Sequence, residues 1–336
     1  MTSVQRALVV GAGSIGSRHL ENLRALGIPA RGLVEPFSER REAVSRQCSA
    51  VAFASLEQGL AWRPDIVVLA TPTQLHVAQA LDVARAGIPA FVEKPLSHTL
   101  ERIPDLLGEV GGRGIISMVG CNMRFHPGPA KIKELLEQQS IGRVLFARVH
   151  TGSYLPDWRP TQDYRQSYSA SDAGGCILDC IHEIDLARWY MGEVTEVTAL
   201  AAHLSRLEVA SEDVAAMLFR HAGGGISEVH LDFAQRTYER GCHIAGEAGS
   251  IFWDFSAGRV RLFQAPTGRE TIFDQPRNWA VNQMYLDEMR HFLACVRDEK
   301  PTAFPVEEGA RVLRIALAAK QSAGNLVRLG AEAMTA

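Results

Sequence analysis

Apolar residues in the first third of the chain fall into short runs that alternate with helical segments. The run at residues 65–71 is almost entirely apolar, which is typical of a parallel strand covered on both faces. The helical segments end at glycines such as Gly27 and Gly87, where helix C-caps are expected. The predicted strands are residues 7–10, 31–35, 65–71, 90–94 and 115–120. This alternation predicts an α/β fold with a doubly wound parallel sheet.

After residue 124 the pattern changes to consecutive strands joined by short turns, such as the glycines at 223–225, which indicates a mainly antiparallel sheet. The predicted strands are residues 144–150, 194–204, 212–221, 225–236, 240–247, 250–255 and 258–264. The predicted helices are residues 128–139, 173–191, 281–298 and 307–329. We therefore expect two domains, residues 1–123 with the parallel sheet and residues 124–336 with an open, mainly antiparallel α/β arrangement.

Composition places few further limits on the protein. The 336 residues are 46% hydrophobic and 22% charged, as in an ordinary soluble globular protein. The net charge of -3 gives no electrostatic reason to expect a nucleic acid or an anionic membrane as partner. The chain shows no signal sequence and no apolar stretch of the roughly 20 residues that span a bilayer. Its six cysteines lie in apolar stretches, as reduced, buried thiols do, so we expect a cytoplasmic protein.

A glycine-rich turn, Gly11-Ala12-Gly13-Ser14-Ile15-Gly16, links the first predicted strand to a helix. In a turn of this kind the first glycine permits the tight bend, the second admits a pyrophosphate and the third lets helix pack on strand. The phosphates then lie at the positive end of the helix dipole. Glu35 ends the next strand, where a carboxylate accepts hydrogen bonds from ribose hydroxyls and repels a 2′-phosphate. The turn predicts a Rossmann domain that binds NAD, while Arg40 and Arg41 keep NADP open as an alternative.

Two further strands end in polar residues at the edge where cofactors lie in such sheets. Thr71-Pro72-Thr73 and His76 follow one strand and are expected to line the nicotinamide or its ribose; His76 is otherwise a capping or surface histidine. Glu93-Lys94-Pro95 follows the other strand. A lysine that leaves an apolar strand is costly to bury without a function, and its ammonium could bind a substrate hydroxyl and stabilise an alkoxide. The alternative is a lysine at a surface strand end.

The predicted helix 173–191 carries a second polar group. Asp179 and His182 are three residues apart and lie side by side on a helix, so the carboxylate is expected to raise the pKa of the imidazole and orient it as a general base. The alternative is a polar pair on a solvated face. Cys176 and Cys180 stand near His182, but no second pair of ligands completes a metal site, and we expect none.

A loop at about residues 155–172 is rich in aromatic and basic residues, which suit sugar rings and anionic substituents. The alternative is a loop that packs against another domain or subunit. The loop and its N-terminal flank contain Tyr154, Trp158, Arg159, Asp163, Tyr164, Arg165 and Tyr168.

Taken in order, these motifs resemble the Gfo/Idh/MocA oxidoreductases, which include glucose-fructose oxidoreductase and inositol dehydrogenase. The resemblance covers essentially the whole chain. It is carried by the glycine-rich turn, Thr71-Pro72 with His76, Glu93-Lys94-Pro95, the run from Gly120 to Pro127, and Gly174-Gly175 followed by Asp179, His182 and Asp185.

The resemblance implies hydride transfer between NAD and a ring carbinol or ketone of a sugar, nucleotide sugar or cyclitol, and a homo-oligomer, dimeric or tetrameric. It implies that Lys94 binds the reacting hydroxyl, that His182 accepts its proton and that Asp179 orients the pair. Many members have one more residue between the Asp and the His, so the shorter spacing here shifts Asp179 around the helix relative to His182. The residues expected to bind substrate are Arg124, Trp158, Arg159, Tyr164 and Tyr168. The alternatives are an NAD-dependent glycosidase without net redox change and a non-catalytic NAD-binding regulator.

Overall fold

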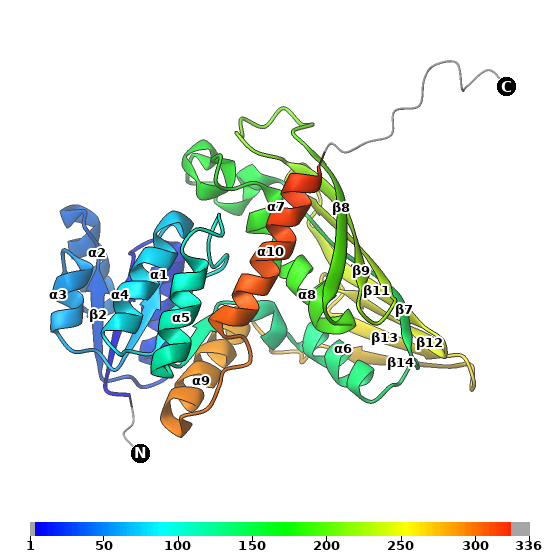
Figure 1. Ribbon diagram of the computed structural model, residues 1–336, viewed down its shortest axis with the longest axis horizontal. Helices are drawn as coiled ribbons and strands as arrows, with labels where there is room; N and C mark the ends of the chain where they lie inside the picture. The colour runs from blue at the N-terminus through cyan, green and yellow to red at the C-terminus, as the bar shows by residue number, and fades with distance from the viewer. Residues whose placement is uncertain (1–3, 324–336) are drawn as a thin grey trace.

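The computed structural model describes residues 4–323, which form two sheets with helices around and between them (Figure 1). The N-terminal sheet is parallel, with strand order β3-β2-β1-β4-β5-β6. Its strands are β1 (Arg6–Val10), β2 (Ala30–Val34), β3 (Val51–Phe53), β4 (Ile66–Leu69), β5 (Ala90–Val92) and β6 (Ser117–Val119). The helices that alternate with them are α1 (Ser14–Ala25), α2 (Ser38–Cys48), α3 (Leu56–Ala61), α4 (His76–Arg85) and α5 (Ile103–Arg113).

This strand order is that of a dinucleotide-binding sheet, in which the direction of winding reverses between β1 and β4. All four residues of β4 are buried, as its apolar run predicted. The carboxyl ends of β1 and β4 therefore open a crevice at the edge of the sheet, beside the first turn of α1. The predicted doubly wound α/β domain is confirmed.

The second sheet has eight strands in the order β14-β13-β12-β11-β7-β10-β9-β8, and only β7 and β10 pair in parallel. The strands are β7 (Val144–Gly152), β8 (Val194–Ala202), β9 (Val214–His221), β10 (Ile226–Asp232), β11 (Glu239–Gly246), β12 (Gly249–Asp254), β13 (Arg259–Gln264) and β14 (Arg269–Asp274). The helices of this half are α6 (Pro127–Glu137), α7 (Cys176–Asp179), α8 (Ile181–Met191), α9 (Asn282–Asp298) and α10 (Val306–Ser322). Figure 1 shows α6, α8 and α10 on the face of this sheet turned toward the N-terminal domain, and none of the helices within residues 4–323 on its other face.

The structure corrects one predicted helix and adds two strands. The helix predicted over residues 173–191 is two helices, because Cys180 leaves the helical region at φ -91° and ψ 34° and separates α7 from α8. Strands β3 and β14 contain no fully buried residue, and neither was expected. The last helix ends at Ser322 among the described residues, and the remainder of the predicted span to 329 lies outside them.

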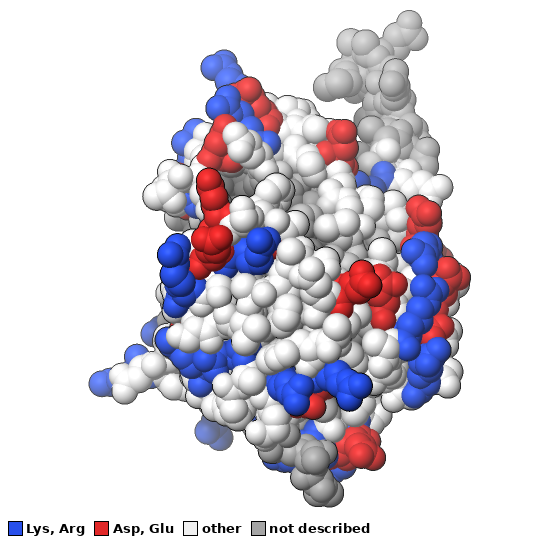
Figure 2. Space-filling model, turned by 90° about the vertical axis from the view of Figure 1, so that its left-hand side faces the viewer, with Lys and Arg blue, Asp and Glu red and all other residues white. Residues whose placement is uncertain are grey.

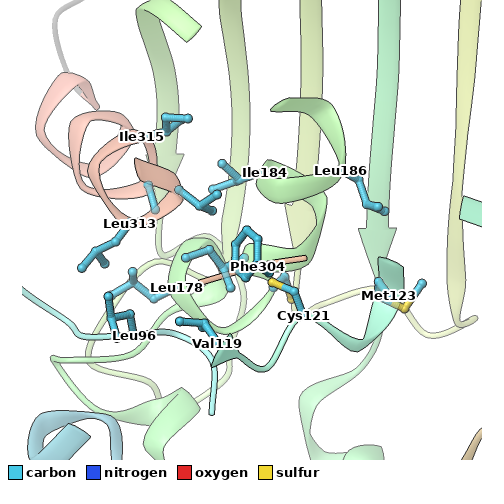
Figure 3. Close-up of a cluster of buried hydrophobic side chains, with 14 of the residues drawn as sticks. Leu96, Val119, Cys121, Met123, Leu178, Ile184, Leu186, Phe304, Leu313 and Ile315 are labelled. Atoms are coloured by element: carbon cyan, nitrogen blue, oxygen red, sulfur yellow. The ribbon is translucent and has the colours of Figure 1, made fainter. Parts of the chain in front are cut away.

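One continuous apolar core joins the two halves of the molecule. Figure 3 shows Leu96 and Val119 of the N-terminal domain beside Leu178, with Phe304 and Leu313 of the C-terminal segment packed against them. A backbone hydrogen bond of 2.8 Å from the Val119 N–H to the Phe304 carbonyl extends the parallel sheet toward that segment. The two sheets therefore hold a fixed relative position, while the domain boundary at residues 123 and 124 stays a prediction.

No helix within residues 4–323 combines the length and apolar character that a membrane span requires. Figure 2 shows acidic and basic side chains intermixed on the outer face of the N-terminal domain. This distribution agrees with the small net charge of the chain.

Candidate functional site

The glycine-rich loop between β1 and α1 is closed on its inner side and open on its outer side. A Cβ atom at Gly11, where φ is +102°, would lie 2.6 Å from the Ala70 carbonyl oxygen. A Cβ at Gly16 would lie 1.9 Å from the Gly11 carbonyl oxygen. At Gly13, by contrast, a Cβ would meet nothing within 4 Å. The loop thus packs tightly against β4 and leaves its middle glycine bare, which fits the close approach of a dinucleotide diphosphate.

Glu35 lies directly beside this loop at the end of β2. Its side chain is buried, and Oε2 accepts a hydrogen bond of 3.1 Å from the Ala12 N–H. Its Oε1 accepts bonds from the Phe37 N–H at 3.1 Å and from Arg40 Nη2 at 3.0 Å. Arg41 donates to the backbone oxygens of Glu35 and Pro36. The carboxylate therefore stands where a ribose hydroxyl is expected, and it engages Arg40, the cation nearest to that position.

Two cavities adjoin the crevice, and they share part of their walls. The cofactor-side cavity, of about 450 Å³, is lined by Ser14, Ile15, Arg18, Thr71, Pro72, Thr73, His76, Glu93, Lys94, Asn122, Trp158, Arg159, Ser167, Tyr168, Ser169, Asp179, His182 and Tyr285. The sheet-side cavity, of about 520 Å³, is lined by Lys94, Thr151, Ser153, Tyr154, Asp157, Trp158, Asp179, Cys180, His182, Arg236, Tyr238, Arg240 and Tyr285. Lys94, Trp158, Asp179, His182 and Tyr285 line both cavities. Two ligands, one in each cavity, would therefore come together at these side chains.

Lys94 and Asp179 form an ion pair at this junction. Lys94 Nζ donates to Asp179 Oδ1 at 2.9 Å and to the Asp179 backbone oxygen at 2.6 Å. Burial opposes the charge on Lys94, but the neighbouring carboxylate outweighs burial and holds the pKa of Lys94 above its ordinary value. Lys94 is therefore an ammonium at neutral pH, and one of its three donors remains available toward the cavities.

Asp179 does not pair with His182, contrary to the expectation from their spacing. It is the last residue of α7, and Cys180 breaks the helix before His182, so the side-by-side geometry of one continuous helix is lost. Its Oδ2 accepts a hydrogen bond from Ser169 Oγ. Burial favours the neutral acid, yet Lys94 and this hydrogen bond together lower the pKa of Asp179, which remains a carboxylate.

His182 is the second residue of α8 and is 7% exposed. Its Nδ1 is buried and has no hydrogen-bond partner among the described residues. Burial, with added repulsion from Lys94 and Arg240, lowers the pKa of His182 well below the ordinary value of 6.5, whereas the sequence led us to expect a raised pKa. The imidazole is therefore neutral at pH 7, the state in which it can accept a proton.

Comparisons with known proteins agree on one family. Residues 5–121 match the model of the oxidoreductase family with an NAD-binding Rossmann fold, and residues 130–252 match the GFO/IDH/MocA C-terminal domain. The chain belongs to the Gfo/Idh/MocA oxidoreductases.

Relatives of this family match nearly the whole chain. The chain is 27% identical to a scyllo-inositol 2-dehydrogenase (NAD(+)) of Bacillus subtilis, over 95% of this chain and 94% of the relative. It is 28% identical to a myo-inositol 2-dehydrogenase of Thermotoga maritima, over 94% of this chain and 95% of the relative. A solved levoglucosan dehydrogenase in complex with NADH and levoglucosan has the same fold, with a TM-score of 0.86 at 21% identity over 95% of this chain and 96% of that one.

The Rossmann domain of this Gfo/Idh/MocA chain therefore binds NAD, and two histidines brace its binding edge. His76 is buried, with Nδ1 3.0 Å from the Pro95 carbonyl oxygen and Nε2 2.8 Å from that of Thr71. His19 Nε2 lies 2.7 Å from Glu93 Oε1. His76 thus links the ends of β4 and β5, with both ring nitrogens occupied by the protein itself, and His19 links α1 to the end of β5.

The structure places Arg124, expected to bind substrate, outside both cavities. Its guanidinium makes two bonds to the Asp185 carboxylate, of 2.9 Å and 2.6 Å, and a third of 3.3 Å to the Ala303 carbonyl oxygen. It lies between the rings of Trp189 and Phe304, 5.0 Å and 4.3 Å from their centroids. Through these contacts Arg124 connects α8 to the C-terminal segment.

The aromatic loop divides between the cavities. Trp158 lines both and is held by a bond of 2.7 Å from its Nε1 to Ser153 Oγ. Tyr168 lines the cofactor-side cavity, where burial raises its pKa to about 12. Tyr164 reaches neither cavity, and its hydroxyl accepts a bond from the Glu208 N–H. Arg159 lines the cofactor-side cavity but not the sheet-side cavity.

Sequence reasoning missed the wall that the second sheet contributes. This wall consists of Thr151, Ser153, Arg236, Tyr238 and Arg240, with Tyr285 from α9 completing the junction. Arg236 stacks over the Tyr154 ring at 3.6 Å, and Arg240 Nε bonds Glu183 Oε1 at 2.7 Å. Alternation along β7 and β11 indicates which residues face inward. It does not indicate which strand ends lie at the cofactor edge, because the packing of the two sheets against each other determines that.

Among residues 4–323, no group of three or more His, Cys, Asp and Glu side chains is arranged to hold a metal ion.

Proposed function

We propose that the protein oxidises a ring carbinol of a sugar, nucleotide sugar or cyclitol with NAD, or reduces the corresponding ketone with NADH. The observation that carries this proposal is the junction of the two cavities, where a paired ammonium and a neutral imidazole face the same space. The named activities of the inositol and levoglucosan dehydrogenases support the substrate class.

Each residue at the junction has a distinct part in this reaction. Bound NAD supplies the acceptor for the hydride that leaves the carbinol carbon. Lys94 donates a hydrogen bond to the reacting oxygen and stabilises the negative charge that develops on it. His182 takes the hydroxyl proton, because its depressed pKa keeps it neutral. Asp179 keeps Lys94 charged and fixes its position. In the reverse direction His182 returns the proton to the ketone oxygen.

The lining of the sheet-side cavity supports a polyol substrate. Hydroxyl groups of Thr151 and Ser153 offer hydrogen bonds, and the rings of Tyr154 and Trp158 offer flat surfaces on which a sugar ring packs. The ion pairs of Lys94 and of Arg240 leave these two cations locally neutralised. A ring with several hydroxyls therefore fits the cavity.

The test is a screen of inositols, sugars and nucleotide sugars with NAD, followed by NADH absorbance. We expect turnover with at least one of them, and a loss of about a hundredfold or more in kcat in Lys94→Ala and His182→Ala. Lys300→Ala, at an exposed position away from the cavities, is the control and should retain full activity.

Two results of the screen would contradict the proposal. Release of a sugar leaving group without net NADH would identify a glycosidase. Tight NADH binding with no turnover of any compound would indicate a regulator.

We also propose that the protein assembles as a homo-oligomer, a dimer or tetramer, through the bare face of the second sheet. Exposed apolar side chains on this face include Phe146, Leu218 and Ile226, and Ile226 pairs with Phe146 in the ladder. A patch of this kind on a soluble protein marks an interaction site. Light scattering should show an oligomer that Leu218→Glu dissociates; a monomeric wild type would contradict this proposal.

We further propose a cytoplasmic location and a function without nucleic acid. All six cysteines are free and buried, which agrees with a reducing compartment. Figure 2 shows acidic side chains beside the basic ones on that face, and the net charge of the chain is -3. Fractionation of the cells that produce the protein tests the location.

A further inference from the structure

Arg159 is an unpaired cation at the edge of the cofactor-side cavity. It follows the 3₁₀ helix Leu155–Trp158 and is exposed. Within residues 4–323 its guanidinium has no hydrogen bond or ion pair. Arg165, six residues further along the same loop, is by contrast tied to Asp163 by bonds of 2.8 Å and 2.9 Å and to Glu208. The five donors of Arg159 are therefore free for a ligand.

The neighbours of Arg159 locate it along the cofactor. It lines the cofactor-side cavity together with Ser14, at the start of α1. It also lines a third hollow, of about 430 Å³, together with Arg40, which bonds the ribose-binding candidate Glu35. At the other end, its charge is close enough to contribute to the lowered pKa of Asp179, the partner of Lys94. Arg159 thus lies between the adenosine end and the reacting end of the site, where the diphosphate of a dinucleotide must be.

The Rossmann domain itself supplies little positive charge at this point. The loop Gly11–Gly16 contains no lysine or arginine, so its contribution to a diphosphate consists of backbone N–H groups and the dipole of α1. The next cation along the helix is Arg18, whose guanidinium lies over the Tyr285 ring, 4.5 Å from its centroid. A diphosphate bound to this loop would still lack a charged partner on the opposite wall, and a guanidinium binds phosphate oxygens in a bidentate manner.

We propose that Arg159 binds the diphosphate of NAD(H) from the C-terminal domain, rather than the substrate as its loop first suggested. It closes the second wall of the cofactor site and couples cofactor binding to the loop that carries Trp158 into both cavities. This inference depends on NAD binding and not on the proposed dehydrogenase activity.

The experiment measures binding to protein freed of copurified nucleotide, by fluorescence or calorimetric titration. The probes are NADH and ADP-ribose, which contain the diphosphate, and adenosine, which lacks it. We expect Arg159→Ala to weaken NADH and ADP-ribose alike by about tenfold to a hundredfold, as for loss of a charged hydrogen bond, and to leave adenosine unchanged. Arg159→Lys should restore part of the affinity, because it keeps the charge and loses the fork.

Arg165→Ala is the matched control, since it removes an arginine of the same loop that lines none of the three cavities. It should bind NADH as the wild type does. The melting temperature of ligand-free Arg159→Ala should equal that of the wild type, because the side chain has no partner within the described protein. Unchanged affinity for NADH and ADP-ribose would overturn the proposal, and so would an equal loss in both variants. A raised KM for the sugar with unchanged affinity for NADH would show that Arg159 binds the substrate instead.

Discussion

Gly13→Ala separates the cofactor function of the glycine-rich loop from its structural function. Gly13 has φ -69° and ψ -177°, values that alanine adopts without strain, and an added Cβ meets no atom within 4 Å. Substitution of a glycine by alanine in a compatible conformation stabilises a fold by about 0.4–1 kcal/mol through the unfolded chain. We therefore expect the melting temperature of the ligand-free variant to be unchanged or slightly higher.

The same methyl group points into the space that a diphosphate needs, so binding should suffer where folding does not. A backbone hydrogen bond to a charged group contributes about 1.5–3 kcal/mol, and loss of one such bond weakens binding about tenfold to 150-fold. Titration of NADH into ligand-free protein measures this change. Two glycines provide the contrast: Gly16→Ala should unfold the loop, because its Cβ would lie 1.9 Å from the Gly11 carbonyl oxygen. Gly108→Ala, in the exposed part of α5, should affect neither binding nor loop structure.

If Gly13→Ala binds NADH as tightly as the wild type does, the reasoning is refuted, because the diphosphate then does not lie against Gly13. A melting temperature that falls together with the affinity would also refute it, since the open space at Gly13 would then not exist.

Three further predictions concern the ionised groups around the site. Asp179→Asn should lower the pKa of Lys94, because the carboxylate that raises this pKa is gone. The alkaline limit of kcat should then move to lower pH, and an unchanged limit would show that Lys94 does not determine it. The rate of oxidation should stay level down to about pH 6.5 and fall only below that value, because burial holds the pKa of His182 beneath 6.5 and its protonated form accepts no proton; a pH–rate profile that already falls above neutrality would contradict this. Arg124→Ala should cost about 3–5 kcal/mol of stability by leaving Asp185 buried and unpaired, yet preserve KM for substrate in the folded fraction, as denaturant unfolding and kinetics can test.

The sequence was most informative where one strand or helix determines its own burial pattern. β4 was predicted because all four of its residues are buried between helices on both faces. β14 alternates between exposed and half-buried residues at the edge of its sheet, and α2 buries only Cys48, so neither produces the apolar signal by which strands and helices are recognised. The parallel sheet was thus predictable almost completely, and the edges of both domains were not.

Contacts between distant residues decided the remainder of the site. Arg124 belongs to a run that matches the family, and the sequence contains no sign that Asp185, 61 positions away, neutralises it. Lys94 and Asp179 are 85 positions apart, and the prediction that they act together came from resemblance alone. Periodicity constrains residues within one helix or strand, whereas these pairs are set by how two sheets and the C-terminal segment pack.

Asp179 and His182 show why helical spacing failed at the central point of the site. In one continuous helix their three-residue spacing would place the carboxylate beside the imidazole, and the imidazole pKa would rise. Instead Cys180 separates α7 from α8. The two side chains therefore belong to different helices, and their relative orientation does not follow from their spacing in the sequence. Ser169 holds one oxygen of Asp179 while the other bonds Lys94. The helix break at Cys180 therefore leaves the carboxylate with the lysine, and the histidine stays neutral because no acid compensates for its burial.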